Sequence, residues 1–193
     1  NSLATQNFTT ATNTYNTAVG FQAGVSVTTG IQNTLIGGLA GDALTDADFN
    51  VAIGIATLST DTLGSKSVAI GNSALSTQNF TTATDVYNTA VGSAAGALIS
   101  TGIHNTIIGG LAGDALTDAD SNIAIGVSAL STDTLGSKSV AIGQAALATQ
   151  NFTTATDTYN TAVGFNAGIY VTTGLQNTLI GALAGDEMTT GSS

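Results

Sequence analysis

The chain has 193 residues and a net charge of −10, and only 7% of its residues are charged, against about 25% in an ordinary soluble domain. Two Lys and no Arg cannot form a basic patch, so we expect nucleic acid and anionic membrane surfaces to be poor partners. The chain has no Cys, which excludes disulfides and thiolate metal sites, and no apolar run approaches the roughly 20 residues of a membrane helix.

Residues 1–15 form the first element in chain order. From Ser2 onward they align with residues 74–87, so they correspond to the second part of a repeat unit and predict a partial turn. The segment NTAVGFQAG at Asn16–Gly24 then returns as Asn88–Gly96 and Asn160–Gly168, at a spacing of 72 residues. Residues 16–87 and 88–159 match at 55 of 72 positions.

Each 72-residue unit contains four shorter units, three of 17 residues and one of 21. Their consensus is [N/S]-[T/V/I]-[A/L/I]-[V/I]-G-x-x-[A/T]-[G/L], a short strand that ends at a glycine. A period of 17 is too short for helical repeats. We therefore predict one all-β domain over 1–193, a parallel β-solenoid of about ten turns. The turns start at Asn16, Asn33, Asn50, Ser67, Asn88, Asn105, Asn122, Ser139, Asn160 and Asn177.

The strand is apolar on both of its faces. Position 4 is Val or Ile in every turn, from Val19 to Ile180, and we predict that it forms one continuous ladder inside the solenoid with position 2 on the same side. Position 3 is Ala or another apolar residue, as at Ala18, Leu35 and Ala69. Because a strand that is apolar on both faces is buried on both, we expect position 3 to face outward and to contact other copies in a homotrimer.

Three further features are read as structural. The glycine at position 5 predicts a corner with a positive φ or with no room for a side chain. The Asn at position 1 predicts a ladder of stacked amides from turn to turn. The 21-residue turn adds a Thr-rich bulge, at Gln78–Tyr87, at Gln150–Tyr159 and in part at Gln6–Tyr15, which we expect to protrude once in four turns.

The segments NVAIG, SVAIG, NIAIG and NTAVG, each followed by x-x-[A/T], resemble the head repeats of trimeric autotransporter adhesins, and NTAVGFQAG…TTGIQNTLIGGLAG is similar to repeats of bacteriophage tail fibres. The resemblance covers nearly the whole chain. It implies a left-handed parallel β-roll, three chains side by side, and the SVAIG-type strand at the centre of the trimer. The turns of 17 and 21 residues are longer than the usual repeat of the adhesin family.

Candidate chemical sites are few. D-x-D-x-N spacing at Asp46, Asp48 and Asn50, and again at Asp118, Asp120 and Asn122, gives weak calcium candidates. The glycine and the terminal glutamate of a calcium loop are missing, which favours a solvated acidic corner. His104 is the only histidine, with Gln32 and Gln176 as its equivalents, and we interpret it as a polar corner residue rather than a metal ligand. Lys66 and Lys138 follow Asp61 and Asp133, which predicts weak surface pairs.

The sequence predicts no enzyme and no cofactor. The one glutamate, Glu187, is near the end of the chain, and the aspartates recur with the repeat as structural residues do. We expect a non-enzymatic fibre segment outside the cytoplasm, and the resemblance to phage repeats implies that it is most readily part of a virion tail fibre. The host receptor would be a cell-surface glycan or protein, and Phe21, Phe165 and Tyr170 are the candidate contact residues.

Two alternatives stay open. One is the head of a bacterial surface adhesin. The other is an ice-binding solenoid, which would need a Thr at the same outward position on every turn. Thr occupies position 2 in six of ten turns, and we place that position inside.

Overall fold

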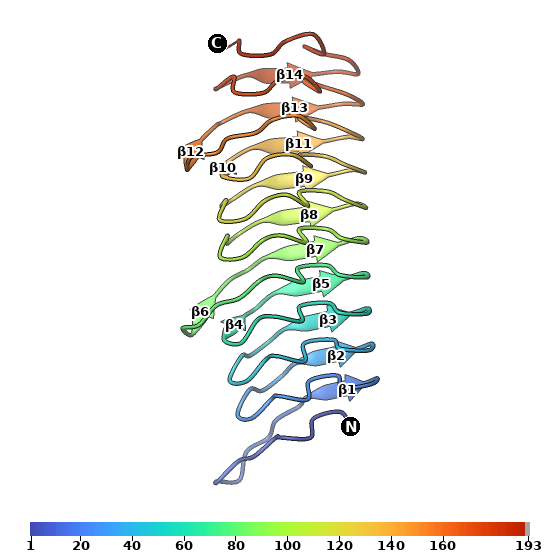
Figure 1. The fold of residues 1–193 in the computed structure, drawn as a ribbon, viewed down its shortest axis with the longest axis vertical. Coiled ribbons are helices and arrows are strands. Elements are labelled where there is room, and N and C mark those ends of the chain that lie inside the picture. Colours follow the sequence, from blue (N-terminus) through green and yellow to red (C-terminus); the bar gives the residue numbers. More distant parts are fainter. Residues whose placement is uncertain (192–193) are drawn as a thin grey trace.

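The computed structural model describes residues 1–191 and is an all-β parallel solenoid of about ten turns, with no helix in that part of the chain (Figure 1). The predicted all-β parallel solenoid of about ten turns is thereby confirmed, whereas its left-handed coil and its trimeric state stay predictions. Residues 192–193, the last two of the predicted repeat domain, lie outside the described residues. The main sheet takes one strand from each turn: β1 (Thr17–Val19), β2 (Thr34–Ile36), β3 (Val51–Ile53), β5 (Val68–Ile70), β7 (Thr89–Val91), β8 (Thr106–Ile108), β9 (Ile123–Ile125), β11 (Val140–Ile142), β13 (Thr161–Val163) and β14 (Thr178–Ile180).

Neighbouring strands of this sheet pair in parallel and in register with the repeat. Val51 of β3 pairs with Val68 of β5 across a 17-residue turn, and Val68 pairs with Thr89 of β7 across a 21-residue turn. The four extra residues therefore do not shift the ladder. They form the predicted bulges, which stand out from the stack at β6 (Thr84–Asp85) and β12 (Thr156–Asp157) (Figure 1). These strands pair with β4 (Gly64–Ser65) and β10 (Gly136–Ser137), respectively.

The glycine at position 5 fulfils both of its predicted roles. At Gly109, φ is +135°, and an added Cβ would lie 2.5 Å from the carbonyl oxygen of Gly126 in the next turn. No side chain fits there, because adjacent backbones approach each other too closely. Corners elsewhere use non-glycine residues in the left-handed region, among them Gln22 (φ 55°), Leu58 (φ 51°) and Tyr87 (φ 54°). Hydrogen bonds between turns hold these corners, as from the Leu39 N–H to the Phe21 carbonyl at 2.8 Å.

The predicted asparagine ladder is present and buried. The Asn33 Oδ1 accepts a hydrogen bond from the Asn50 backbone N–H at 2.9 Å, and the Asn33 Nδ2 donates to the Ala47 carbonyl at 2.7 Å. The ladder therefore satisfies backbone groups of its own and the following turn. Direct amide-to-amide contacts are longer, as at 3.4 Å between Asn33 Nδ2 and Asn16 Oδ1.

The predicted orientation of the strands is wrong. Position 3 faces inward: Leu35, Ala69 and Ile107 have no exposed surface. Positions 2 and 4 face outward, and Val19 is 58% exposed. The physical reason is volume. The interior already holds columns of Ala at position 8 and of Leu, Val or Ile from positions 9 and 12, so only a small side chain fits at position 3 in most turns.

Positions 3 and 9 share one space inside the solenoid. Leu58 at position 9 accompanies Ala52 at position 3, whereas Leu35 at position 3 accompanies Gly41 at position 9. An added Cβ on Gly41 would lie 2.7 Å from a methyl carbon of Leu35. Large residues at both places would overpack the turn. This complementarity gives the inner volume a four-turn period and explains part of the 72-residue repeat.

A buried polar cluster anchors each complete bulge. The Asp61 Oδ1 accepts hydrogen bonds from the N–H groups of Gly64 and Phe80 at 3.0 and 2.9 Å, and its Oδ2 accepts one from Gln78 Nε2 at 2.6 Å. Gln78 also bonds Ser67 at 3.0 Å and accepts from Asn88 Nδ2 at 3.0 Å. Gln78 thus bridges the asparagine ladder where Ser67 interrupts it. Asp133 and Gln150 repeat this arrangement in the second bulge.

Candidate interaction surface

The outward side of the main sheet is a regular surface that runs through all ten turns. Side chains alternate along a strand, so positions 2 and 4 point away from the interior, and position 6, beyond the glycine corner, is partly or fully exposed in every turn. We call the residues at these positions the apolar face. Its edge column at position 2 is Thr17, Thr34, Val51, Val68, Thr89, Thr106, Ile123, Val140, Thr161 and Thr178. Its middle column at position 4 is Val19, Ile36, Ile53, Ile70, Val91, Ile108, Ile125, Ile142, Val163 and Ile180. Its other edge at position 6 is Phe21, Gly38, Ile55, Asn72, Ser93, Gly110, Val127, Gln144, Phe165 and Ala182.

The middle column was predicted to be the inner ladder, and the structure places it on the surface. Ile108 is 37% exposed and Ile180 71% exposed, and no member of the column is buried. The sheet therefore presents a continuous row of Val and Ile to the outside of the chain.

No charged residue lies on the apolar face, although the chain carries twelve acidic residues. The 17 differences between residues 16–87 and 88–159 are also unevenly placed. None falls at position 4 and one falls at position 2, whereas six fall at positions 6 and 7. The outward position 4 is therefore Val or Ile in all ten turns, although the interior of the chain does not contact this side of the strand.

The corner at position 17, just before each strand, carries the two lysines of the chain, Lys66 and Lys138. Lys66 lies 2.6 Å from Asp85 of the bulge and 3.1 Å from the Tyr87 hydroxyl, and its Nζ lies 5.1 Å from the centre of the Tyr87 ring. His104 stacks on that ring at 5.8 Å. The hydrogen bond to Asp85 raises the pKa of Lys66 above its usual value. Both partners are exposed, so the pair ties the bulge to the stack only weakly.

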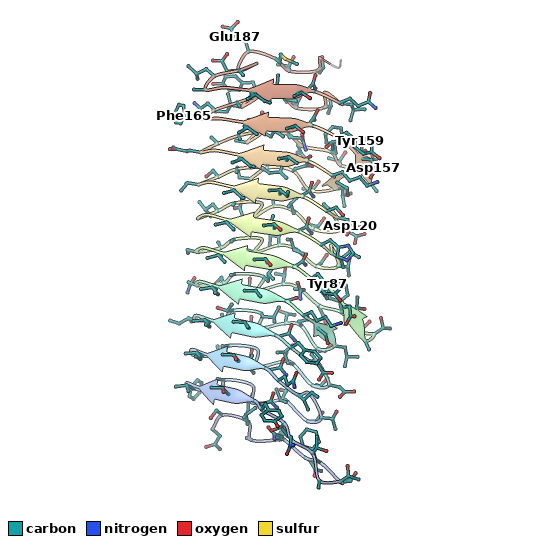
Figure 2. All side chains as sticks on the ribbon, turned by 180° about the vertical axis from the view of Figure 1, so that it is seen from behind. Tyr87, Asp120, Asp157, Tyr159, Phe165 and Glu187 are labelled. Atoms are coloured by element: carbon teal, nitrogen blue, oxygen red, sulfur yellow. The ribbon has the colours of Figure 1, made fainter. Side chains whose placement is uncertain are left out.

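The same arrangement recurs four turns later. Lys138 lies 2.5 Å from Asp157 and 5.3 Å from the centre of the Tyr159 ring. Hydrogen bonding with Asp157 raises the pKa of Lys138, and hydrogen bonding with Lys138 lowers the pKa of Asp157. Figure 2 shows Tyr87, Tyr159 and Asp157 at one end of the strands and Phe165 at the other. The predicted pairing of the lysines with Asp61 and Asp133 is wrong, because those carboxylates are buried.

The three predicted contact residues all lie on the surface but not together. Phe21 and Phe165, 69% and 51% exposed, belong to the position-6 edge of the apolar face. Tyr170, 56% exposed, lies beyond the corner at position 11, where Leu98 is its exposed equivalent. Val171, the residue after Tyr170, is fully buried and belongs to the core rather than to the surface. The role of the three contact residues in binding stays a prediction.

The calcium candidates make hydrogen bonds within the stack. Asp46 accepts from the Thr29 hydroxyl, and the Asp48 Oδ1 accepts from the Ile31 N–H at 2.8 Å. Asp118 and Asp120 do the same for Thr101 and Ile103. Within residues 1–191, no three or more His, Asp or Glu side chains are grouped to hold a metal ion.

Sequence reasoning missed Asp42 and Asp114, which lie at equivalent places of the repeat. One carboxylate oxygen of each is buried and has no hydrogen-bond partner in the described chain. Burial raises the pKa of both carboxyls. Since burial disfavours the charged form, each ionised carboxylate is a small source of instability at neutral pH.

The described residues enclose no pocket, and none of them forms a helix long and apolar enough to cross a membrane. The surface therefore offers area for contact and exposed hydrogen-bonding groups at its corners. No family model, curated protein or solved structure matches the chain.

Proposed function

We propose that this chain is a non-enzymatic segment of an extracellular homotrimeric fibre, most readily a bacteriophage tail fibre, that displays a surface for a host receptor. The observation that carries the proposal is the middle column of the apolar face. Ten outward Val and Ile residues in line are costly in water, because each exposes apolar surface that a neighbouring chain would cover.

The size of the apolar face supports assembly. Ten strands at about 4.8 Å give a length of roughly 43 Å, and five residues give a width of roughly 16 Å. One copy thus offers about 700 Å² of mean plane, close to the ~800 Å² per partner of a typical stable interface. At a net charge of −10, copies repel each other elsewhere, so the uncharged face is the surface on which they meet most favourably.

The outward positions outside the middle column support display. The corner at positions 6 and 7 and the segment around Leu98 and Tyr170 differ between repeats that are otherwise closely similar. Exposed aromatic side chains there, such as Phe165 and Tyr170, provide contact area with few rotatable bonds. The bulges add exposed threonines, including Thr81 and Thr82, at a spacing of four turns.

A cell-binding assay tests the display role. The segment should bind host cells, and the combined variant Phe21→Ser, Phe165→Ser and Tyr170→Ser should bind about tenfold less, because it loses several aromatic contacts. Phe49→Ser is the matched control, since it removes an exposed aromatic ring at a corner where the second repeat already has Ser121. Failure of the unaltered segment to bind would make it a shaft without a receptor site. Cleavage of a surface polysaccharide would contradict the non-enzymatic role.

Ice binding is a second candidate, and the structure favours it more than the sequence does. Thr17, Thr34 and the four other Thr of position 2 face outward next to the Val and Ile column, on one regular sheet. Ice binding requires that the apolar face be free in solution, whereas the fibre requires that other copies cover it. A monomeric chain with thermal hysteresis would select ice binding over the fibre.

A bacterial adhesin head would use the same trimer. The genes next to the coding sequence separate these two, because a tail fibre lies among virion genes and an adhesin carries a membrane anchor in the same reading frame.

A further inference from the structure

The three Thr-rich bulges share the motif Asn-Phe-Thr, at residues 7–9, 79–81 and 151–153. An Asn followed two residues later by Ser or Thr is the acceptor motif for N-linked sugars, typically on a surface loop. None of the other Asn residues of the chain has Ser or Thr at that distance. The motif alone is a weak signal in a chain so rich in Thr, so the question is what its side chains do in the structure.

Asn79 and Asn151 lie at position 13, where the other turns have Thr or Ser. A hydroxyl at this position donates a hydrogen bond to a carbonyl of the next turn, as from Thr45 to Thr62 at 3.0 Å. The two Asn side chains make no such bond. The Asn79 Oδ1 only accepts a long hydrogen bond from the Thr62 hydroxyl at 3.4 Å, and no hydrogen bond of its Nδ2 exists within residues 1–191. Asn therefore replaces Thr here without taking over the bond that Thr makes.

Both polar groups of the motif are open to solvent. Among the described residues, the buried side-chain atoms that lack a partner are one oxygen each of Asp42 and Asp114, so the unpartnered Nδ2 of Asn79 is not buried. Thr81 is exposed, and its hydroxyl has no hydrogen-bond partner in the part of the chain that the structure describes. The motif at residues 151–153 is in the same state. The amide that would accept a sugar and the hydroxyl that completes the motif are thus both free.

We propose that Asn79 and Asn151, with Asn7 in the partial turn, are acceptors of N-linked sugars. In this reaction the amide Nδ2 bonds to C1 of a sugar that is activated as a diphosphate. The C1–O bond breaks, the diphosphate carrier leaves with the electron pair of that bond, and the amide gives up one proton. A transferase that reads the motif supplies the activated sugar. The modification does not depend on the proposed trimer or on the proposed receptor.

The buried residue of the motif indicates when the sugar is added. Phe80 is 8% exposed, and its N–H donates to the buried Asp61 at 2.9 Å. A transferase that encloses the motif needs all three residues free, so addition comes before the bulge closes. The sugar then remains outside, because Nδ2 is open. Four turns at about 4.8 Å place successive sugars about 19 Å apart, on bulges that stand out from the stack (Figure 1).

Mass spectrometry of peptides from the chain, isolated from the cells or virions that make it, tests the proposal. A hexose or N-acetylhexosamine is expected on Asn79 and on Asn151. Unmodified Asn at both positions would overturn the proposal, and so would a sugar on Thr81 in place of Asn79.

Variants made in the same cells test whether the motif directs the modification. Asn79→Gln and Thr81→Ala should each lose the sugar of that bulge and keep the sugar of the next one. Asn72→Gln and Thr82→Ala are the matched controls and should keep both, because Asn72 is an exposed Asn outside the motif whose repeat equivalent is Gln144. A sugar that persists in Thr81→Ala would contradict recognition of the motif.

The fold and the assembly are checked in the same variant. Asn79→Gln should keep the circular dichroism and the sedimentation mass of the unaltered chain, because the Asn79 amide makes no bond that the stack requires. A modified chain that sediments as a monomer would contradict the proposed fibre and leave the sugar sites intact. An unmodified chain that forms a trimer would overturn the sugar sites alone.

Discussion

Ile107 and Ile108 are neighbours in β8, yet they belong to different environments. Ile107 points into the solenoid and has no exposed surface, whereas Ile108 points outward and is 37% exposed. The inner side of the strands changes with the turn, from Ala to Leu or Ile, because it must fit the residues at position 9. The outer middle column is Val or Ile in all ten turns. The inner side thus follows the packing of one chain, whereas the outer middle column keeps Val or Ile whatever residue the interior holds.

The sharpest way to test this contrast is a charge on each side of one strand. Ala69→Glu buries a carboxylate in a fully closed interior, at a cost of about 3–5 kcal/mol or more, and should abolish folding. Ile70→Glu places the same group on the outer side and should leave the fold intact while it prevents association. Circular dichroism and sedimentation measure the two effects. A folded Ala69→Glu monomer would mean that the two sides of the strand are reversed.

A second test of the two sides of a strand shortens a side chain on each side instead of introducing a charge. In the monomeric Ile70→Glu background, Ile107→Ala should lower the free energy of unfolding by about 2–5 kcal/mol through the cavity it leaves. Ile108→Ala should lower it by less, about 1–1.5 kcal/mol, since its side chain is 37% exposed in the single chain and leaves no closed cavity. Urea unfolding measures both, and equal losses would contradict the assignment of inside and outside.

The fold was predictable from the sequence because the same residue types recur at the same positions of every turn. The 17- and 21-residue periods, the Gly corner and the Asn ladder all follow from spacing and residue type, and the structure confirms them. The direction of the strand was not predictable from hydrophobicity, since Ala and Ile are both apolar. The signal that would have settled it is the pairing of positions 3 and 9, where Leu35 accompanies Gly41 and Ala52 accompanies Leu58. Residues that share a space must lie on the same side.

The buried polar clusters were missed for a different reason. Asp61 and Gln78 lie at position 12, which is Val, Leu or Ile in the other two turns of the first two units. Asp and Gln are residue types that usually lie on the protein surface. Only the bulge, which brings the Phe80 N–H and the Gln78 amide to Asp61, makes burial possible.

The polar cluster around Asp61 gives a test with an intermediate expected loss of stability. Asp61→Leu should destabilise the monomer by about 2–4 kcal/mol, because it leaves donors of Gly64, Phe80 and Gln78 buried without an acceptor. Asp46→Leu is the control at an exposed site and should change stability by less than about 0.5 kcal/mol. Equal unfolding midpoints for the two variants would show that the bulge is not held by Asp61.

The smallest expected effect concerns pH. The pKa of Asp42 is raised in the folded state, so the folded chain holds this proton more tightly than the unfolded chain. Stability should therefore fall as the pH rises from the unfolded pKa of about 3.8 through the folded pKa. Asp42→Asn combined with Asp114→Asn should remove part of this fall and raise the Tm at neutral pH by about 1–2 °C. Thermal melts of the double variant and of the unaltered chain at pH 4 and pH 7 measure this change in Tm. A double variant with a lower Tm than the unaltered chain at pH 7 would contradict the buried, unpaired state of these oxygens.

The mass of the unaltered chain in solution tests the central claim most directly, that the apolar face joins copies. Sedimentation equilibrium at micromolar concentration should give about three times the 18.9 kDa of one chain. Ile53→Glu, in the middle column, should reduce the mass to that of one chain without loss of β structure. A folded, unaltered chain that sediments as a monomer of 18.9 kDa would contradict the account.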